Sequence, residues 1–340
     1  MRLIALVESP EHVCCRYRLE SFRAHLEASG HTLELRTLPR GLFSRVSLFR
    51  ELRTSDVVVL QRKLLPRTQL AMLRRYARRI VFDFDDAVWH RDSYDVKGLH
   101  SYRRIRRFAR TVQSSEVVVA GNSFLSAEAA RYSKDTRVMV IPTCVDPSEY
   151  PIATHMLRRS PGLNLVWVGS SSTLQGLERI RPILESIGRN IPGSRLKLVC
   201  DRFVGFANLP VDPIPWCAAT ESREIATADV GIAWMPDDPW SRGKCGLKVL
   251  QYHAAGLPVI ANPVGVHNEF VTHGENGFTA NTPDEWLTAA HALTDANLRR
   301  TLGHAGRAQL EERYSVAAGA KHWVELLHEF ADPVAGRRTG

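Results

Sequence analysis

Short runs of valine, isoleucine and leucine alternate with stretches of helical periodicity along this chain. The candidate strands are residues 3–7, 32–37, 56–60, 80–84, 116–121 and 137–142, then 163–169, 195–200, 229–234 and 257–262. Near-continuous apolar runs separated by helices are typical of parallel strands that helices cover on both faces. The pattern therefore predicts an α/β fold built from doubly wound parallel sheets.

The alternation breaks at residues 151–162, which carry proline and glycine. At 340 residues the chain exceeds the length at which a single core stops growing, so two domains are expected. We predict a first domain over 1–155 and a second over 162–313, with a cleft between them. The amphipathic residues 314–332 predict a C-terminal helix that packs back toward the first domain.

Composition indicates a cytoplasmic protein. No stretch approaches the roughly 20 apolar residues that span a bilayer, and the apolar run at the N-terminus is too short for a signal peptide. The six cysteines show neither a CxxC pair nor metal-ligand spacing, which favours reduced thiols.

Positive charge is concentrated in the first half of the chain. Residues 1–160 hold 28 lysines and arginines against 17 acidic residues, whereas the remainder holds 17 against 19. The excess lies largely in 67–80 and 101–110, where arginines alternate with apolar residues at helical spacing. Each stretch is either a solvated helix face or a docking face for anionic lipid head groups or a phosphorylated acceptor. Because the aromatic residues of a single-strand binding platform are missing, nucleic acid is disfavoured.

Ligands of such folds bind beyond the carboxyl ends of the strands. After the first strand, Arg16 and Arg18 are expected near a helix start, as a clamp for a phosphate or acceptor or as ordinary surface arginines. After the fifth, Asn122 or Ser123 is expected to cap a helix, and the preceding glycine leaves room for a ligand beside Asn122.

The fourth candidate strand ends in three aspartates, Asp83, Asp85 and Asp86. Carboxylates crowded together need a cation, a donor or solvent. A metal-binding D-x-D and a capped turn are both open interpretations. The segment "VFDFDDA" also resembles the opening strand of haloacid dehalogenase phosphatases, although Asp86 and Ala87 stand where that family usually has glycine and threonine.

Two segments of the second half predict phosphate binding. Gly169, Ser170 and Ser171 follow a strand and open a helix, so their amides and hydroxyls can hold a phosphate.

The second segment is 243–265, where Gly246 allows close approach to a helix that begins near Leu247. Lys244 and Lys248 flank this helix start, where cations oppose the helix dipole unless an anion binds. Gln251, one turn further, can reach a sugar hydroxyl.

Residues 246–280 resemble the donor-site segment of family 4 glycosyltransferases, the retaining enzymes of the GT-B fold. The matching positions are Gly256, Pro258, Val259, Gly265, Glu269, Gly274 and Gly277. Further similar segments are 15–35, 120–132, 140–150 and 228–238, so the resemblance covers both domains.

The chain departs from that family at its two characteristic glutamates, which fall on Gly243 and Gln251. The usual arginine and lysine of the second domain are replaced by Ser170 or Ser171 and by Gln175. Lys248 matches a lysine of a related glycosyltransferase pattern.

The resemblance therefore implies that Lys248, helped by Arg242 and Lys244, neutralises the donor diphosphate. It also places Asp85 or Asp86 where the family often has a histidine.

The implied function is transfer of a hexosyl group from a nucleotide-sugar to a hydroxyl with retention. The positive charge of the first domain, and not the resemblance, favours a glycan or lipid-linked glycan as acceptor in cell-envelope polysaccharide or glycolipid synthesis. The same charge favours a cytoplasmic protein that associates peripherally with the inner face of an anionic membrane. No cofactor or metal is expected, so the D-x-D is not a metal site. The alternatives are a nucleotide-sugar-binding protein that has lost turnover and a haloacid-dehalogenase-type phosphatase.

Overall fold

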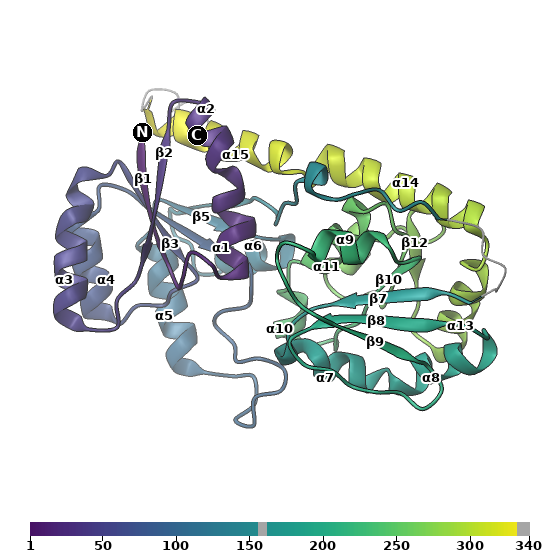
Figure 1. The fold of residues 1–340 in the computed structure, drawn as a ribbon. Coiled ribbons are helices and arrows are strands. Elements are labelled where there is room, and N and C mark those ends of the chain that lie inside the picture. The colour runs from purple at the N-terminus through teal and green to yellow at the C-terminus, as the bar shows by residue number, and fades with distance from the viewer. Residues whose placement is uncertain (156–161, 332–340) are drawn as a thin grey trace. The chain divides into compact units, whose positions relative to one another are not determined.

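The computed structural model describes residues 1–155 and 162–331, which form two compact units (Figure 1). The first unit consists of Met1–Cys144, Asp238–Cys245 and the C-terminal segment from Val316. The second consists of Val145–Asp237 and Gly246–Ser315. Each unit contains one six-stranded sheet in which all strand pairs are parallel. This is the predicted α/β architecture.

The sheet of the first unit has the order β2-β1-β3-β4-β5-β6. Its strands are β1 (Arg2–Val7), β2 (Thr32–Thr37), β3 (Val57–Gln61), β4 (Ile80–Phe84), β5 (Val117–Ala120) and β6 (Arg137–Val140). Its helices are α1 (Val13–Arg18), α2 (Arg23–Ala28), α3 (Leu42–Glu51), α4 (Arg67–Tyr76), α5 (Tyr102–Gln113), α6 (Ser123–Ala130), α10 (Pro239–Arg242) and α15 (Val316–Ala331), with short 3₁₀ helices at Glu20–Phe22 and Leu52–Thr54.

Successive residues of these buried strands enter two different cores. Val58 and Leu60 of β3 join a core with α3, α4, α5 and α6, whereas Val57 and Val59 join a core on the other face. The second core includes Trp323 of α15, which packs on this unit beside α2. Side chains alternate across a strand, so a sheet covered on both faces needs apolar residues at every position.

The sheet of the second unit has the order β12-β11-β10-β7-β8-β9. Its strands are β7 (Asn164–Val168), β8 (Arg195–Cys200), β9 (Val211–Pro215), β10 (Val230–Ala233), β11 (Val259–Ala261) and β12 (Gly277–Thr279). Its helices are α7 (Ser171–Arg179), α8 (Arg181–Asn190), α9 (Glu221–Ala226), α11 (Leu247–Ala254), α12 (His267–Phe270), α13 (Pro283–Ala292) and α14 (Ala296–Arg313), with a 3₁₀ helix at Pro147–Glu149.

The sequence pattern missed both edge strands of this sheet. β9 contains Pro213 and Pro215, which cannot donate a ladder hydrogen bond and are tolerated only at a sheet edge. β12 has three residues and begins with Gly277. Neither segment has the apolar run that marks a buried strand.

The unit boundaries differ from the expected domain limits in two places. Residues 145–155 lie with the second unit, where Val145 donates to the Tyr314 carbonyl and Ala153 to the Ala255 carbonyl. Residues 238–245 lie with the first unit, although they connect β10 to α11. Within the expected linker, residues 156–161 lie outside the described residues, as does residue 332 of the expected terminal helix.

No helix in the described ranges combines the length and the apolar character needed to cross a bilayer.

Candidate functional site

The predicted site residues fall into two groups, one in each unit. The first unit contains Arg16, Arg18, Asp85, Asp86, Asn122, Arg242 and Lys244. The second unit contains Gly169, Ser170, Ser171, Gly246, Leu247, Lys248, Gln251 and Glu269. Both groups lie where helices and loops follow the carboxyl ends of parallel strands, the usual position of ligands in this architecture.

In the first unit, Arg18 forms a buried ion pair with Asp83. Nε of Arg18 lies 3.1 Å and 3.2 Å from the two carboxylate oxygens, and Nη1 donates to the Ile141 carbonyl at 2.8 Å. The Arg18 side chain is 1% exposed and the Asp83 side chain is fully buried. Arg18 therefore holds β4 against the end of β6, and the sequence provided no sign of this partner.

The expectation that Arg16 and Arg18 lie near the start of a helix is wrong. Helix α1 begins at Val13 and is only six residues long, so both arginines are in its last turn. The N–H groups at its start are served by the His12 side chain, which accepts from the Cys14 amide. These arginines therefore do not lie beside the free N–H groups of a helix start, where a phosphate would bind.

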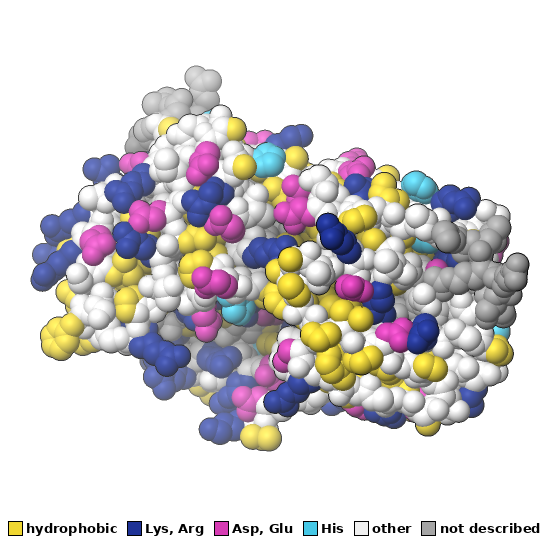
Figure 2. Space-filling model, in the orientation of Figure 1, with side chains coloured by type: hydrophobic (Ala, Val, Ile, Leu, Met, Phe, Trp, Pro, Cys, Tyr) yellow, Lys and Arg dark blue, Asp and Glu magenta, His cyan; other side chains and the backbone are white. Residues whose placement is uncertain are grey.

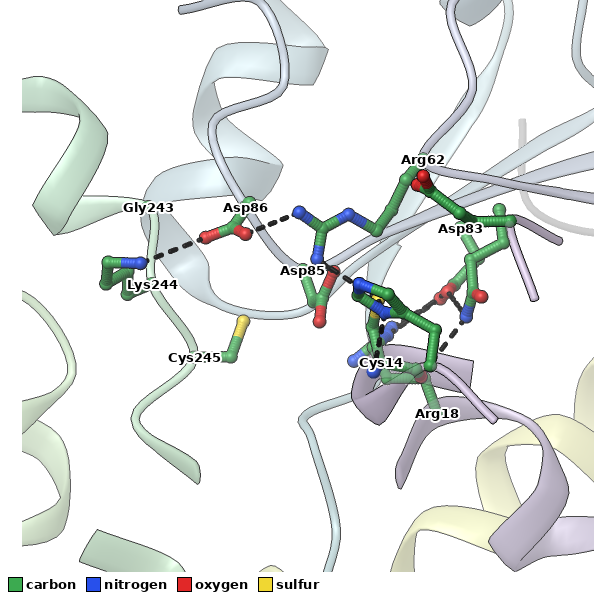
Figure 3. Close-up of polar contacts among 12 residues, drawn as sticks. Cys14, Arg18, Arg62, Asp83, Asp85, Asp86, Gly243, Lys244 and Cys245 are labelled. Atoms are coloured by element: carbon green, nitrogen blue, oxygen red, sulfur yellow. Dashed lines mark hydrogen bonds and ion pairs between the residues drawn. The ribbon is translucent and has the colours of Figure 1, made fainter. Parts of the chain in front are cut away.

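Arg62 is the centre of the charged cluster at this edge of the sheet (Figure 3). It follows β3 directly, and its Nη1 donates to Asp85 at 2.9 Å while its Nη2 donates to Asp86 at 2.6 Å. One guanidinium thus holds both carboxylates through charge-assisted hydrogen bonds. Its backbone has φ of 58°, a left-handed conformation that costs a non-glycine residue about 1–3 kcal/mol and is found most often at functional sites.

Burial raises the pKa of the Asp85 carboxyl, and the neighbouring charge of Asp86 raises it further while Arg62 opposes the shift. The Cys14 thiol contacts the same guanidinium at 3.2 Å, and burial raises the pKa of this thiol to about 12. Sequence reasoning missed Arg62. The sequence does show this basic residue directly after β3, the strand that neighbours β4 and its aspartates.

Lys244 lies on the other side of Asp86. Its Nζ is 3.8 Å from Asp86 Oδ1 and 3.6 Å from the centre of the Trp240 ring (Figure 3). The Asn122 side chain donates to the carbonyls of Gly243 and Lys244 at 3.3 Å and 3.0 Å. Its oxygen accepts from the Leu125 amide and caps α6, as the sequence predicts.

Gly243, which the resemblance places at the first glutamate of the family 4 pattern, has no space for a side chain. A Cβ on Gly243 would lie 2.8 Å from both the Cβ and the amide nitrogen of Ala87. The missing carboxylate is therefore a consequence of close backbone packing between residues 238–245 and the loop after β4.

In the second unit, the ring of Trp167 on β7 lies between Gly169 and Lys248. A Cβ on Gly169 would come within 2.5 Å of the ring, so the glycine is needed for this packing. Nζ of Lys248 lies 4.0 Å from the ring centre, a cation–π distance. Trp167 thereby holds the ammonium group in the first turn of α11.

The start of α7 is occupied by a carboxylate of the chain itself. The amide and the hydroxyl of Ser171 donate to Asp201 at 2.6 Å and 2.7 Å. Hydrogen bonding to Ser171 lowers the pKa of Asp201. Ser170 precedes the helix, and its hydroxyl contacts that of Ser172 at 2.7 Å. The Asp201 carboxylate therefore occupies the helix start where the sequence predicted a bound phosphate.

Helix α11 begins at Leu247, as predicted. Its N-cap is Gly246, with φ of 60° and no side-chain cap hydrogen bond. A Cβ on Gly246 would approach Val266 and Phe270 to within 2.7 Å and 2.8 Å, so both the conformation and the space require glycine.

Gln251 and Glu269 occupy contrasting positions. Gln251 is 2% exposed and donates to the Tyr150 hydroxyl at 3.1 Å, so its side chain serves internal packing. Glu269 is exposed on α12.

On the same short helix, His267 is buried and contacts the Asn262 carbonyl at 2.9 Å through Nδ1. Burial lowers the pKa of His267 to about 4, and the charge of Lys248 lowers it further.

Among the described residues no group of three or more histidine, cysteine, aspartate or glutamate side chains is arranged to hold a metal ion.

Comparison with known proteins identifies the fold of both units. Residues 215–296, from the end of β9 to the first residue of α14, match the family model described as "Glycosyl transferases group 1". No match is found among curated proteins.

Solved structures resemble the whole chain at low identity. Sucrose-phosphate synthase from Thermosynechococcus elongatus has a TM-score of 0.78 at 17% identity and covers 98% of this chain and 99% of its own. A glycosyltransferase from Rickettsia africae has a TM-score of 0.72 at 11% identity, covering 97% and 98%. HepE of Anabaena, in complex with UDP and glucose, has a TM-score of 0.69 at 16% identity, covering 97% and 100%. The chain therefore has the GT-B fold of two Rossmann-like domains, as the sequence predicted.

Proposed function

We propose that this protein transfers a hexosyl group from a nucleotide-sugar donor to a hydroxyl of an acceptor, with retention of configuration. The observation that carries the proposal is the uncapped start of α11 with Lys248 in its first turn, inside the segment that matches the glycosyltransferase family model. The likeness to HepE, which was solved with UDP and glucose, supports a nucleotide-sugar as the donor.

The donor diphosphate binds at the start of α11. Its amide groups and the Lys248 ammonium face the oxygens on which negative charge develops as the sugar departs. The cation–π contact with Trp167 holds Lys248 in this position. In this arrangement the chain's own cations take the role of a metal ion. Lys248 is the principal cation because it lies in the first turn of α11, and Lys244, which contacts Asp86, assists it.

The acceptor hydroxyl is received in the first unit by Asp85 and Asp86. Arg62 orients both carboxylates, and each retains oxygens that can accept a hydrogen bond from a sugar hydroxyl. A polyhydroxylated acceptor, such as a glycan or a lipid-linked glycan of the cell envelope, suits two carboxylates with fixed spacing.

The first test is a thermal-shift panel of nucleoside diphosphates and nucleotide-sugars, each in EDTA and in magnesium. A ligand at 100 times its dissociation constant stabilises the folded state by about 2.7 kcal/mol. We expect one nucleotide class to raise the melting temperature equally in both buffers. A shift that needs magnesium contradicts the metal-free donor site.

Lys248→Ala tests the site itself. We expect loss of the nucleotide-induced shift and a fall in transfer of roughly 100-fold or more, with unchanged stability of the unliganded protein. Lys321→Ala, which removes an exposed lysine of α15, is the matched control. Transfer at the normal rate by Lys248→Ala would refute the proposed role.

The second candidate function is binding of a nucleotide-sugar without turnover. It is favoured by the loss of both family glutamates. At these positions Gly243 packs against Ala87, and Gln251 donates to the Tyr150 hydroxyl. Stabilisation by a nucleotide-sugar that is never consumed, with any acceptor offered, supports this alternative. The phosphatase alternative is disfavoured because Asp83, the residue in the position of its nucleophile, is fully buried against Arg18.

A further inference from the structure

Helix α5 carries a row of arginines along one side. Arg103, Arg106, Arg107 and Arg110 are spaced at positions i, i+3, i+4 and i+7, which lie on one face of a helix. The opposite side packs into the core of the first unit through Phe108 and Val112. Helix α5 contains no acidic residue.

No acidic side chain among the described residues pairs with these arginines. Arg103, Arg106 and Arg110 form no hydrogen bond or ion pair with any residue in the described ranges, in contrast to Arg74 of α4, which pairs with Glu116. Partial burial lowers the pKa of Arg107, and the charge of Arg103 lowers it further. Like charges at this spacing destabilise a helix, so the row costs free energy unless an anion lies against it.

Two strongly exposed apolar side chains precede the row in the chain. Tyr102, the first residue of α5, is 86% exposed, and Val96 in the preceding loop is 99% exposed. The loop is folded rather than extended, because Arg91 binds the carbonyls of Lys97, Gly98 and His100. Figure 2 shows lysine and arginine side chains gathered over the position that α5 occupies in Figure 1.

We propose that this face docks on the surface of an anionic lipid bilayer, with Arg103, Arg106 and Arg110 at the head groups and Val96 and Tyr102 in the interface. A basic face beside apolar side chains is the pattern that binds peripheral proteins to anionic membranes. A nucleic acid strand would instead need several stacking aromatic residues, and this surface presents one. The inference extends beyond sugar transfer and does not depend on it.

The experiment measures co-sedimentation of the full chain with phosphatidylcholine vesicles and with vesicles enriched in phosphatidylglycerol. We expect binding to the anionic vesicles alone, weakening steeply as salt is raised. Each arginine near such a surface contributes about a factor of five in partitioning, so R103E/R106E/R110E is expected to bind roughly 100-fold more weakly. These three arginines are chosen because their removal breaks no hydrogen bond, whereas Arg104 and Arg107 bind backbone carbonyls.

The matched control is R189E/R223E/R300E, which makes the same change in net charge at exposed arginines of the second unit. We expect it to bind anionic vesicles nearly as the unaltered protein does. An equal loss in both triple variants would show that net charge alone drives binding and would overturn the proposal.

Two further outcomes are decisive. V96S/Y102S is expected to lose the part of vesicle binding that survives high salt. Binding of a single-stranded RNA oligonucleotide that R103E/R106E/R110E abolishes, without vesicle binding, would assign the face to nucleic acid and overturn the proposal. Because nucleotide-induced thermal shifts are measured on the same variants, failure of vesicle binding is distinguishable from failure of the donor site.

Discussion

Single residues at the ends of the strands decide the charge of each candidate site. Arg62 accepts a left-handed backbone and thereby brings one guanidinium to Asp85 and Asp86. Asp201 fills one helix start in the second unit, while Gly246 leaves another without a cap. The first unit therefore presents carboxylates that are already balanced by arginine, and the second presents the ammonium group of Lys248 against the ring of Trp167.

A buried histidine within α11 makes stability depend on pH. His253 of α11 is fully buried against Gly306, and neither ring nitrogen has a hydrogen-bond partner among the described residues. Burial lowers the pKa of His253 to about 4 from its ordinary value of 6.5. The unfolded chain binds this proton more readily, so the free energy of unfolding falls as pH decreases from 6.5 toward 4.

We expect His253→Leu to raise the free energy of unfolding by about 1 kcal/mol at pH 7, because it replaces a buried unpaired polar group. The variant should also lose less stability at acid pH, although His267 still contributes part of that loss. Urea denaturation at pH 7 and pH 5 measures both effects. His291→Leu, an exposed change on α13, is the control, and an identical acid profile in all three proteins would contradict the assignment.

At the scale of elements, α11 is fixed to the sheet by Tyr252. Its hydroxyl accepts from the Val168 amide at 3.1 Å and donates to the Ile232 carbonyl at 3.3 Å, linking the helix to β7 and β10. A Cβ on Gly231 would collide with the Tyr252 ring, so the strand and the helix are in close contact. The position of Lys248 relative to Trp167 depends on this link.

Tyr252→Phe is expected to lower the free energy of unfolding by about 1–3 kcal/mol, since the buried Val168 amide loses its partner. We also expect weaker binding of the donor nucleotide, because the start of α11 is no longer fixed against β7. Urea denaturation and nucleotide titration provide the two readouts. Tyr102→Phe, which alters an exposed ring, should change neither, and full stability in Tyr252→Phe would disprove the link.

At the scale of the whole molecule, each unit has its own apolar core although the chain crosses between the units more than once. Trp323 of α15 belongs to a core of the first unit, whereas Trp286 of α13 belongs to the core of the second. Both side chains are among the largest that are fully buried.

We therefore expect calorimetry to resolve two unfolding transitions, with Trp323→Ala lowering one and Trp286→Ala lowering the other. Removing a buried tryptophan costs about 3–5 kcal/mol in the unit that contains it. A donor nucleotide should raise only the transition that Trp286→Ala lowers. If both substitutions lower one shared transition, the units do not unfold separately.

The sequence by itself predicted the features that depend on local periodicity and backbone preference. Ten of the strands, the start of α11 at Leu247 and the Asn122 cap follow from apolar runs, a glycine and a short polar side chain. Two doubly wound domains followed from the order of such segments, and the GT-B fold followed from the resemblance of residues 246–280 to a glycosyltransferase donor-site segment. The edge strands β9 and β12 were missed because half-exposed, proline-containing or very short strands have no such periodicity.

The tertiary structure alone decided which charges meet. Arg18 with Asp83, Arg62 with Asp85 and Asp86, and Asp201 with Ser171 are pairs that lie 23 to 65 residues apart in the chain. The same holds for the placement of residues 238–245 with the first unit and of α15 on its core. The local sequence determines how each segment folds. Strand order and helix packing determine which residues far apart in the chain come within contact distance.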